Sequence, residues 1–222
     1  MSLMSRKIYR KISRFFDKHL VGFRRRFIKN KSFSIICNNC WGGYVYRRFG
    51  LPYNTPTVGL YFFAEDFCKL CENLRYYMEQ PLEFISYQDS KWKNELIDRQ
   101  QTDIPLGKLG DIEIVFLHYK TEEEAREKWE RRAARINYDN LIFKFSQMNL
   151  CSEKELRKFD KLAADKKIVF VPRKCSNIKS AIFFRSSKGE SQISDDTSEY
   201  QRYISLRKLI NSKYACGNNF ES

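Results

Sequence analysis

The chain has 222 residues, enough for one sizeable domain or two small ones whose core needs no disulfide bonds. It has seven cysteines, an odd number, and its N-terminus shows no uninterrupted apolar stretch of the signal-peptide type, so we expect a reducing, cytoplasmic location. The longest apolar runs are far shorter than the ~20 residues that span a bilayer, which excludes an integral membrane protein.

The formal net charge of +14 is concentrated at one end of the chain. Residues 1–31 contain eleven Lys and Arg but only one acidic residue, Asp17, whereas the other 191 residues carry a net charge of only +4. The sequence therefore predicts a basic N-terminal arm, residues 1–31, followed by a nearly balanced domain, residues 32–222, with a possible subdivision near residues 100–110.

Apolar residues recur along the arm at steps of mostly three and four, which predicts an amphipathic helix with one apolar stripe and a basic surface. The stripe consists of Ile8, Ile12, Phe15, Phe16, Leu20, Phe23 and Phe27. Such a helix can lie on an anionic membrane, here at its inner face, or can pack its stripe onto the protein's own core. Nucleic acid is a less favoured partner, because the chain has no zinc-finger spacing and no RNP-type aromatic motif.

The first half of the domain alternates short apolar runs with turns and helical spacing. We expect strands at residues 33–37, 57–63 and 82–87. Between them we expect a helix that starts near residues 41–46, a rigid loop from Pro52 to Pro56, and a helix over residues 65–78. Residues 91–98 are expected to be a short helix or irregular segment, and residues 104–110 a loop or edge strand.

The second half begins with the clearest strand, residues 111–118, whose unbroken apolar core suits a strand covered on both faces. Thr121 and Glu124 form a capping-box pattern for the next helix, and Ser152 is a cap for a later one. Further strands are expected at residues 141–145, 167–171 and 181–184, and a last helix after Ser198. Strands that alternate with helices predict an α/β fold with a mostly parallel sheet flanked by helices, in Rossmann-like layers.

The most informative stretch is Asn38-Asn39-Cys40-Trp41-Gly42-Gly43, between the first expected strand and the next helix. Glycines in such a turn let backbone N–H groups approach a phosphate or an oxyanion at a helix N-terminus, and the two amides could orient substrate hydroxyls. The pattern matches neither G-x-G-x-x-G nor the Walker A motif. Taken alone, a tight turn in which the Asn side chains satisfy the backbone is the simpler explanation.

His118 is one of two histidines and stands at the carboxyl end of the clearest strand. If strands 33–37 and 111–118 are parallel neighbours, its imidazole lies at the same sheet edge as Cys40, where α/β proteins bind ligands. This arrangement would suit a Cys–His nucleophilic pair, or His118 as a general base with Cys40 as a pocket wall. A hydrogen-bonded structural histidine is an equally good explanation.

Two C-x-x-C pairs, Cys37/Cys40 and Cys68/Cys71, have the spacing of zinc ligands. Cys71 falls on the apolar stripe of a helix and Cys37 lies inside a strand, so we expect buried thiols and no metal site.

The helix after Thr121 ends with Arg132 and Arg135, whose guanidinium groups could bind phosphate or carboxylate. Ion pairs along the helix and the favourable placement of cations at a helix C-terminus give a simpler account. In a right-handed β-α-β unit this helix end returns to the sheet edge opposite His118, so only a dimer partner or another loop would unite the two groups.

Five stretches carry a family resemblance: SIICNNCWGG, FGLPYNTPTVGLYFFAEDF, YYMEQPLEFI, GDIEIVFLHYKTEEEAREKWERRAARIN and YDNLIF. Together they resemble the bacterial domain-of-unknown-function 1919 family, whose members are often labelled exopolysaccharide biosynthesis proteins. The resemblance implies an α/β fold and a role in making cell-surface polysaccharide, without a defined reaction. The positions that match the family pattern are Asn38, Asn39, Cys40, Trp41, Gly42, Gly43, Pro52, Tyr53, Asn54, Thr55, His118, Tyr119, Lys128, Trp129, Arg132, Arg135 and Asn137.

Two functional hypotheses follow. In the first, the protein is an enzyme that transfers a glycosyl or acyl group to a sugar intermediate, with a nucleotide sugar or acyl-CoA as donor and His118 as base. Substrate contacts would come from Asn38, Asn39, Trp41, Gly42, Gly43, Tyr53, Asn54, Arg132 and Arg135. In the second, it is a non-catalytic sugar-binding or scaffold protein of the assembly machinery. No further cofactor is expected, and the chain could act as a homodimer.

Overall fold

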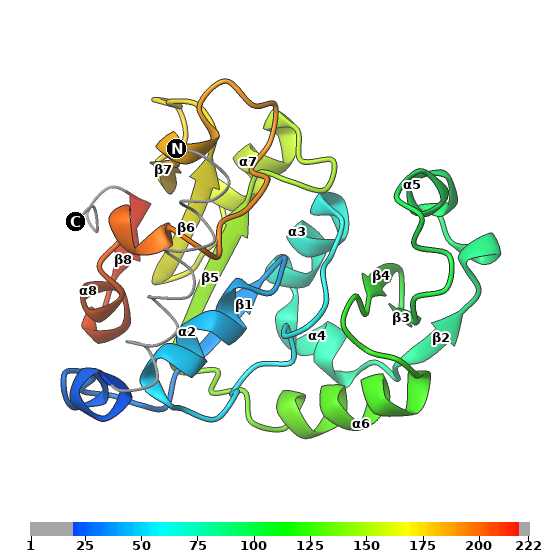
Figure 1. Ribbon diagram of the computed structural model, residues 1–222, viewed down its shortest axis with the longest axis horizontal. Coiled ribbons are helices and arrows are strands. Elements are labelled where there is room, and N and C mark those ends of the chain that lie inside the picture. Colours follow the sequence, from blue (N-terminus) through cyan, green and yellow to red (C-terminus); the bar gives the residue numbers. More distant parts are fainter. Residues whose placement is uncertain (1–19, 218–222) are drawn as a thin grey trace.

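The computed structural model describes residues 20–217 and shows two β-sheets with helices packed around them (Figure 1). The larger sheet contains β1 (Ser34–Cys37), β5 (Leu141–Ser146), β6 (Lys166–Val171), β7 (Ala181–Phe183) and β8 (Ala215–Cys216). All of its pairings are parallel, in the order β1-β5-β6-β7, with β8 also paired to β6. The predicted α/β fold with a mostly parallel sheet is confirmed.

Both faces of the parallel sheet are covered by helices. Successive strand residues point to opposite faces, so Ile35 and Ile142 belong to one apolar cluster and Ile36 and Phe143 to another. The first cluster includes residues of α2 (Trp41–Phe49) and α8 (Leu206–Asn211), and the second includes residues of α3 (Ala64–Glu72) and α7 (Glu153–Asp160). This two-sided cover explains why the strand sequences are almost continuously apolar.

The strand predicted at residues 111–118 belongs to a second sheet. There, β4 (Ile112–Val115) pairs antiparallel with β3 (Leu106–Leu109), which pairs antiparallel with β2 (Glu83–Ile85). Leu109 pairs with Ile112, and Gly110 in the two-residue loop between them has a φ of +58°, which glycine adopts without steric cost. The expectation that this strand is a parallel neighbour of β1 is therefore wrong.

The helices near the antiparallel sheet are α4 (Leu74–Glu79), α5 (Lys93–Asp98) and α6 (Glu122–Ala133). Elsewhere along the chain, short 3-10 turns span Tyr87–Asp89, Arg185–Ser187 and Tyr200–Arg202. Two predicted helix caps are confirmed. The hydroxyl of Thr121 accepts from the backbone N–H of Glu124 at 3.2 Å, and Ser152 forms a complete capping box with Glu155.

Within the N-terminal arm, residues 20–26 are helical. Ile8, Ile12, Phe15 and Phe16 of the predicted stripe lie outside the described residues. Among residues 20–217, none of the helices combines the length and the apolar character that crossing a membrane requires.

Candidate functional site: a basic pocket between α2 and α6

A pocket of about 340 Å³ lies where α2, α6 and the segment after β4 meet, and we call it the α2–α6 pocket. It is lined by Cys40, Gly43, Tyr44, Arg47, Tyr53, Val58, Gly59, His118, Tyr119, Lys128 and Arg132. Five of the residues predicted from the sequence as site residues come together here: Cys40, Gly43, Tyr53, His118 and Arg132.

Arg132 is the most firmly held charged group of the pocket, with only 9% of its surface exposed. Its Nη1 donates to the hydroxyl of Tyr119 at 2.5 Å and to the carbonyl of Val58 at 3.2 Å, and its Cζ lies 5.1 Å from the centre of the Tyr53 ring. Burial raises the pKa of Tyr119, so this phenol stays protonated at neutral pH and donates to the same Val58 carbonyl. The guanidinium is thus held in place before a ligand arrives, which lowers the entropy cost of binding an anion.

The position of Arg132 corrects one expectation. The argument that α6 ends at the sheet edge opposite His118 assumed that the strands before and after α6 belong to one parallel sheet. Because β4 lies in the antiparallel sheet, α6 is free of that constraint and its last turn reaches the pocket. No dimer partner is needed to bring Arg132 and His118 together.

His118 follows β4 and lies exposed at the rim of the pocket. Its backbone N–H donates to the carbonyl of Gly59 at 2.9 Å, which fixes the turn that carries it. Gly59 has a φ of +80°, and a Cβ at this position would lie 2.9 Å from the ring of Tyr119, so only glycine lets the two segments approach this closely. The imidazole itself makes no hydrogen bond with any residue between 20 and 217, which leaves it accessible to a ligand.

Cys40 forms part of the pocket wall. Burial is the main reason that its pKa is raised to about 11, and the neighbouring thiol of Cys37 adds to the effect. Its Sγ donates to the carbonyl of Leu60 at 3.7 Å. Since the thiolate is the nucleophilic form of cysteine, a thiol that stays protonated at neutral pH fits a wall better than a nucleophile.

The pocket is positively charged. Arg47, Lys128 and Arg132 line it together with His118, and none of residues 20–217 adds a carboxylate to its lining. Glu124 pairs with Lys128, but neither Arg47 nor Arg132 forms an ion pair with another described residue. Guanidinium groups beside phenolic rings suit a ligand that carries phosphate or carboxylate. Within residues 20–217, no group of three or more His, Cys, Asp or Glu is placed to hold a metal ion.

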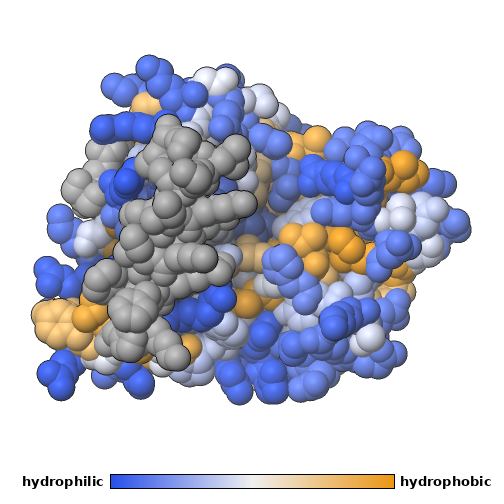
Figure 2. Space-filling view, viewed as in Figure 1, coloured by the Kyte–Doolittle hydropathy of each residue, from blue (hydrophilic) through white to orange (hydrophobic). Residues whose placement is uncertain are grey.

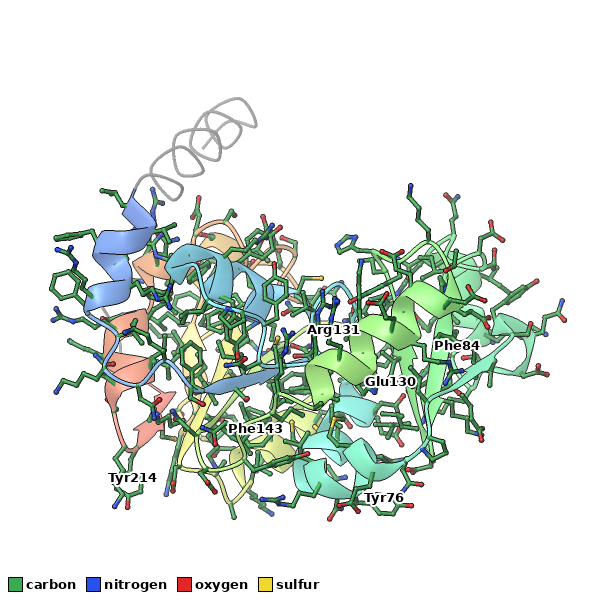
Figure 3. The ribbon with its side chains drawn as sticks, turned by 90° about the horizontal axis from the view of Figure 1, so that it is seen from below. Tyr76, Phe84, Glu130, Arg131, Phe143 and Tyr214 are labelled. Carbon is green, nitrogen blue, oxygen red and sulfur yellow. The ribbon has the colours of Figure 1, made fainter. Side chains whose placement is uncertain are left out.

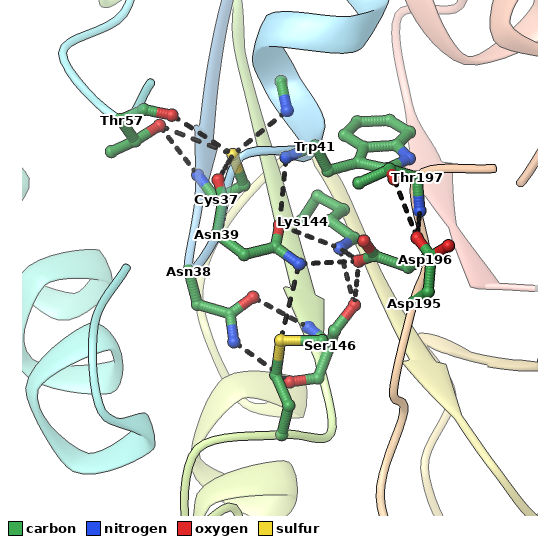
Figure 4. A network of polar contacts seen from close by, with 12 residues as sticks. Cys37, Asn38, Asn39, Trp41, Thr57, Lys144, Ser146, Asp195, Asp196 and Thr197 are labelled. Atoms are coloured by element: carbon green, nitrogen blue, oxygen red, sulfur yellow. Dashed lines mark hydrogen bonds and ion pairs between the residues drawn. The ribbon is translucent and has the colours of Figure 1, made fainter. Parts of the chain in front are cut away.

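Asn38 and Asn39 lie outside the pocket, and their amides bind other parts of the protein (Figure 4). Asn38 exchanges two hydrogen bonds with the backbone of Ser146, which ties the end of β1 to the end of β5. The Oδ1 of Asn39 accepts from the N–H of Trp41 at 3.1 Å, and its Nδ2 donates to Asp196 at 2.8 Å. The simpler interpretation, in which these side chains satisfy their surroundings, therefore fits better than a role in orienting substrate hydroxyls.

Asp196 belongs to a buried polar network at the carboxyl ends of β1 and β5 (Figure 4). It forms an ion pair with Lys144 and accepts from the hydroxyl of Ser146 at 2.5 Å. The ammonium of Lys144 lies 5.4 Å from the centre of the Trp41 ring, and Trp41 is fully buried away from the pocket. This network was not predicted, although a lysine inside the apolar run of residues 141–145 is a signal for it.

The first turn of α2 does not offer its N–H groups to a ligand, which corrects the expectation of a phosphate or oxyanion cradle. The N–H of Gly42 donates to the Sγ of Cys37 at 3.3 Å, and that of Gly43 donates to the carbonyl of Cys40 at 3.1 Å. The glycines serve close packing instead. A Cβ on Gly42 would lie 3.1 Å from the Cys37 sulfur, and one on Gly43 would lie 3.1 Å from a methyl group of Val58.

Two further predicted residues, Asn54 and Arg135, do not line the pocket, and Arg135 is exposed to solvent. Conversely, the predicted site did not include Tyr44 and Arg47. Their signal is helical spacing, since residues 40, 43, 44 and 47 share one face of α2.

The chain matches the family described as Domain of unknown function (DUF1919) over residues 11–214. It is also 32% identical over 171 residues to an "Uncharacterized protein" of Haemophilus influenzae, an alignment that covers 77% of each chain. The protein therefore belongs to the DUF1919 family, as its sequence motifs predicted.

Proposed function

We propose that the α2–α6 pocket binds a sugar derivative that carries phosphate, and that the protein transfers a group from or to this ligand during surface-polysaccharide assembly. The observation that supports this proposal is the composition of the pocket: its described lining residues include three cations, three tyrosines and one accessible imidazole, and no carboxylate. Phosphates pair with guanidinium and ammonium groups, and the amphipathic phenol rings can lie against a sugar while their hydroxyls hydrogen-bond to it. A volume of about 340 Å³ is within the range of small-molecule sites.

In this proposal, Arg132 and Arg47 bind the phosphate groups, and His118 takes a proton from the attacking hydroxyl. An imidazole suits this step because its neutral form has a ring nitrogen that accepts a proton. Cys40 remains a wall of the pocket. The polysaccharide setting comes from the labels often given to family members, and a nucleotide sugar and an acyl-CoA both supply the phosphates that the pocket would bind.

Thermal-shift and calorimetric binding measurements with a panel of nucleotide sugars, sugar phosphates and acyl-CoA test this proposal. We expect a member of the panel to stabilise the protein and Arg47→Gln to weaken its binding at least about tenfold, because a hydrogen bond to a charged group contributes about 1.5–3 kcal/mol. Arg131→Gln is the control, since Arg131 (Figure 3) does not line the pocket and pairs with Glu127 at the surface. Equal binding by both variants, or no binding by any compound, would contradict the proposal.

The second hypothesis, a binding or scaffold protein without turnover, uses the same pocket and is favoured by the protonated thiol of Cys40. Replacement of His118 separates the two. His118→Ala should keep ligand binding within a few-fold in either case, but it should abolish release of nucleoside diphosphate or CoA only if the protein is an enzyme. Unchanged turnover in this variant would remove His118 from the mechanism.

A further inference from the structure

The described part of the N-terminal arm presents apolar side chains to solvent. Phe23 is 60% exposed and Phe27 43% exposed, and Leu20 is also exposed. The rings of Phe23 and Phe27 contact each other at a centroid distance of 5.1 Å and form one patch, which we call the arm patch (Figure 2, lower left). Leu20, Phe23 and Phe27 therefore do not pack onto the core, and packing of the stripe onto the core does not explain why these residues are apolar.

The other side of residues 20–29 is fixed to the domain. Val21 lies against Gly50 at the end of α2, and Ile28 is buried with residues of α2 and α8. The side chain of Asn211, the last residue of α8, accepts from the N–H of Lys29 at 2.9 Å and donates to the carbonyl of Phe27 at 2.8 Å. The protein therefore holds the arm patch in a defined orientation.

The surroundings of the patch are basic. Residues 20–33 contain five Lys and Arg and no acidic residue. Beside the patch, a pocket of about 330 Å³ has Phe27, Phe49 and Leu206 among its apolar lining and includes Arg24, Arg48 and Arg207. The guanidinium of Arg207 lies 5.8 Å from the centre of the Phe27 ring. Arginines around an apolar floor match a lipid, whose phosphate is anionic and whose chains are apolar.

We propose that the arm patch and this arginine-lined pocket form a docking site for an anionic phospholipid membrane, with Phe23 and Phe27 inserted at the interface and a lipid phosphate bound among the arginines. Apolar insertion combined with basic residues is what peripheral membrane binding requires. Single-stranded nucleic acid also stacks its bases on exposed rings, but it does not require the exposed Leu20 or the apolar floor of the pocket. This site is separate from the α2–α6 pocket, so the proposal does not depend on the proposed catalytic function.

Co-sedimentation of the full chain with vesicles tests the proposal. We expect binding to mixed phosphatidylglycerol–phosphatidylcholine vesicles, little binding to pure phosphatidylcholine, and a decrease with added salt. The variant Phe23→Ser/Phe27→Ser should lose at least about tenfold in vesicle affinity, because the apolar insertion is removed, and should keep its thermal midpoint, because both side chains are exposed. Arg207→Gln should weaken binding to the anionic vesicles alone.

The matched control is Tyr76→Ser, which removes a ring that is 54% exposed and lies well away from residues 20–26 (Figure 3). It should bind vesicles as the unmodified chain does. Equal binding by the Phe23→Ser/Phe27→Ser variant and the unmodified chain would overturn the proposal. So would salt-sensitive binding to RNA without vesicle binding, or a dimer in solution that the Phe23→Ser/Phe27→Ser variant dissociates.

Discussion

The ion pair between Lys144 and Asp196 is the single pair whose loss should damage the fold most, because neither side chain reaches solvent. Removing one partner of a buried pair leaves an unpaired charge, which typically costs about 3–5 kcal/mol. We therefore expect Asp196→Ala to lower the free energy of unfolding by about this amount in urea denaturation. Asp139→Ala, at an exposed aspartate, should change it by less than about 0.5 kcal/mol.

A double variant shows whether the charge itself is responsible. Lys144→Met/Asp196→Ala removes both charges and leaves an apolar chain beside the rings of Trp41 and Phe170. It should be more stable than Asp196→Ala alone, since replacing a buried ion pair by apolar groups is often neutral. If the double variant is the less stable one, the cost comes from lost packing rather than from an unpaired charge.

Among the elements, α2 separates the two pockets. Tyr44 and Arg47 face the α2–α6 pocket, whereas Arg48 and Phe49 line the pocket beside the arm patch. The helix ends at Gly50, which has a φ of +59° and whose added Cβ would lie 2.5 Å from a methyl group of Val21. The end of α2 is thus the point where the arm is attached to the domain.

Gly50→Ala should therefore destabilise the protein in two ways: about 1–2 kcal/mol for the left-handed backbone, and a further loss from the clash with Val21. Gly189→Ala is the matched control, because Gly189 also has a positive φ of +89° but a Cβ added there would meet no other atom within 4 Å. In urea denaturation Gly50→Ala should lose more stability than Gly189→Ala. Adding Val21→Ala to Gly50→Ala should bring its loss of stability closer to that of Gly189→Ala. Equal losses in Gly50→Ala and Gly189→Ala would show that the contact with Val21 does not affect stability.

The elements that the sequence predicted best are those whose signals are local. The caps at Thr121 and Ser152 follow from residues three positions apart, and the apolar run of β1 follows from burial. The pairing of β4 was missed although its signal is also local: β3 ends two residues before β4 begins, and Gly110-Asp111 between two apolar runs is a recognised signal for a hairpin.

Which residues of the candidate site meet also depends on how the elements are arranged. Cys40 and His118 were placed together correctly, but for a wrong reason, since the assumed sheet neighbours are not paired. Arg132 reaches the pocket because of how the two sheets are joined, and that arrangement leaves no mark in the spacing of residues. Sequence patterns therefore indicated candidate residues without showing how the fold brings them together.

For the whole molecule, the apolar clusters predict cooperative unfolding. The cluster that contains Ile114 and Phe116 of the antiparallel sheet region also contains Phe145 and Val169 of the parallel sheet. The other two clusters use the opposite faces of the same two sheets: Ile142 and Ile168 in one, and Leu106 and Val115 in the other. Each of these two clusters shares a sheet with the cluster that contains Ile114 and Phe116, so unfolding of one cluster should destabilise the cluster next to it.

The three tryptophans report on these clusters separately: Trp129 lies in the cluster that contains Ile114, Trp41 lies in the cluster that contains Ile142, and Trp92 packs against Phe63 of the smallest cluster. Three variants that keep one tryptophan each, with phenylalanine at the other two positions, allow urea unfolding to be followed by fluorescence. Each variant should show the same midpoint by its own tryptophan fluorescence and by far-ultraviolet circular dichroism, because shared strands couple the clusters. In the Trp92 variant, fluorescence that changes at a lower urea concentration than the circular dichroism signal would instead make the antiparallel sheet region an independent unit.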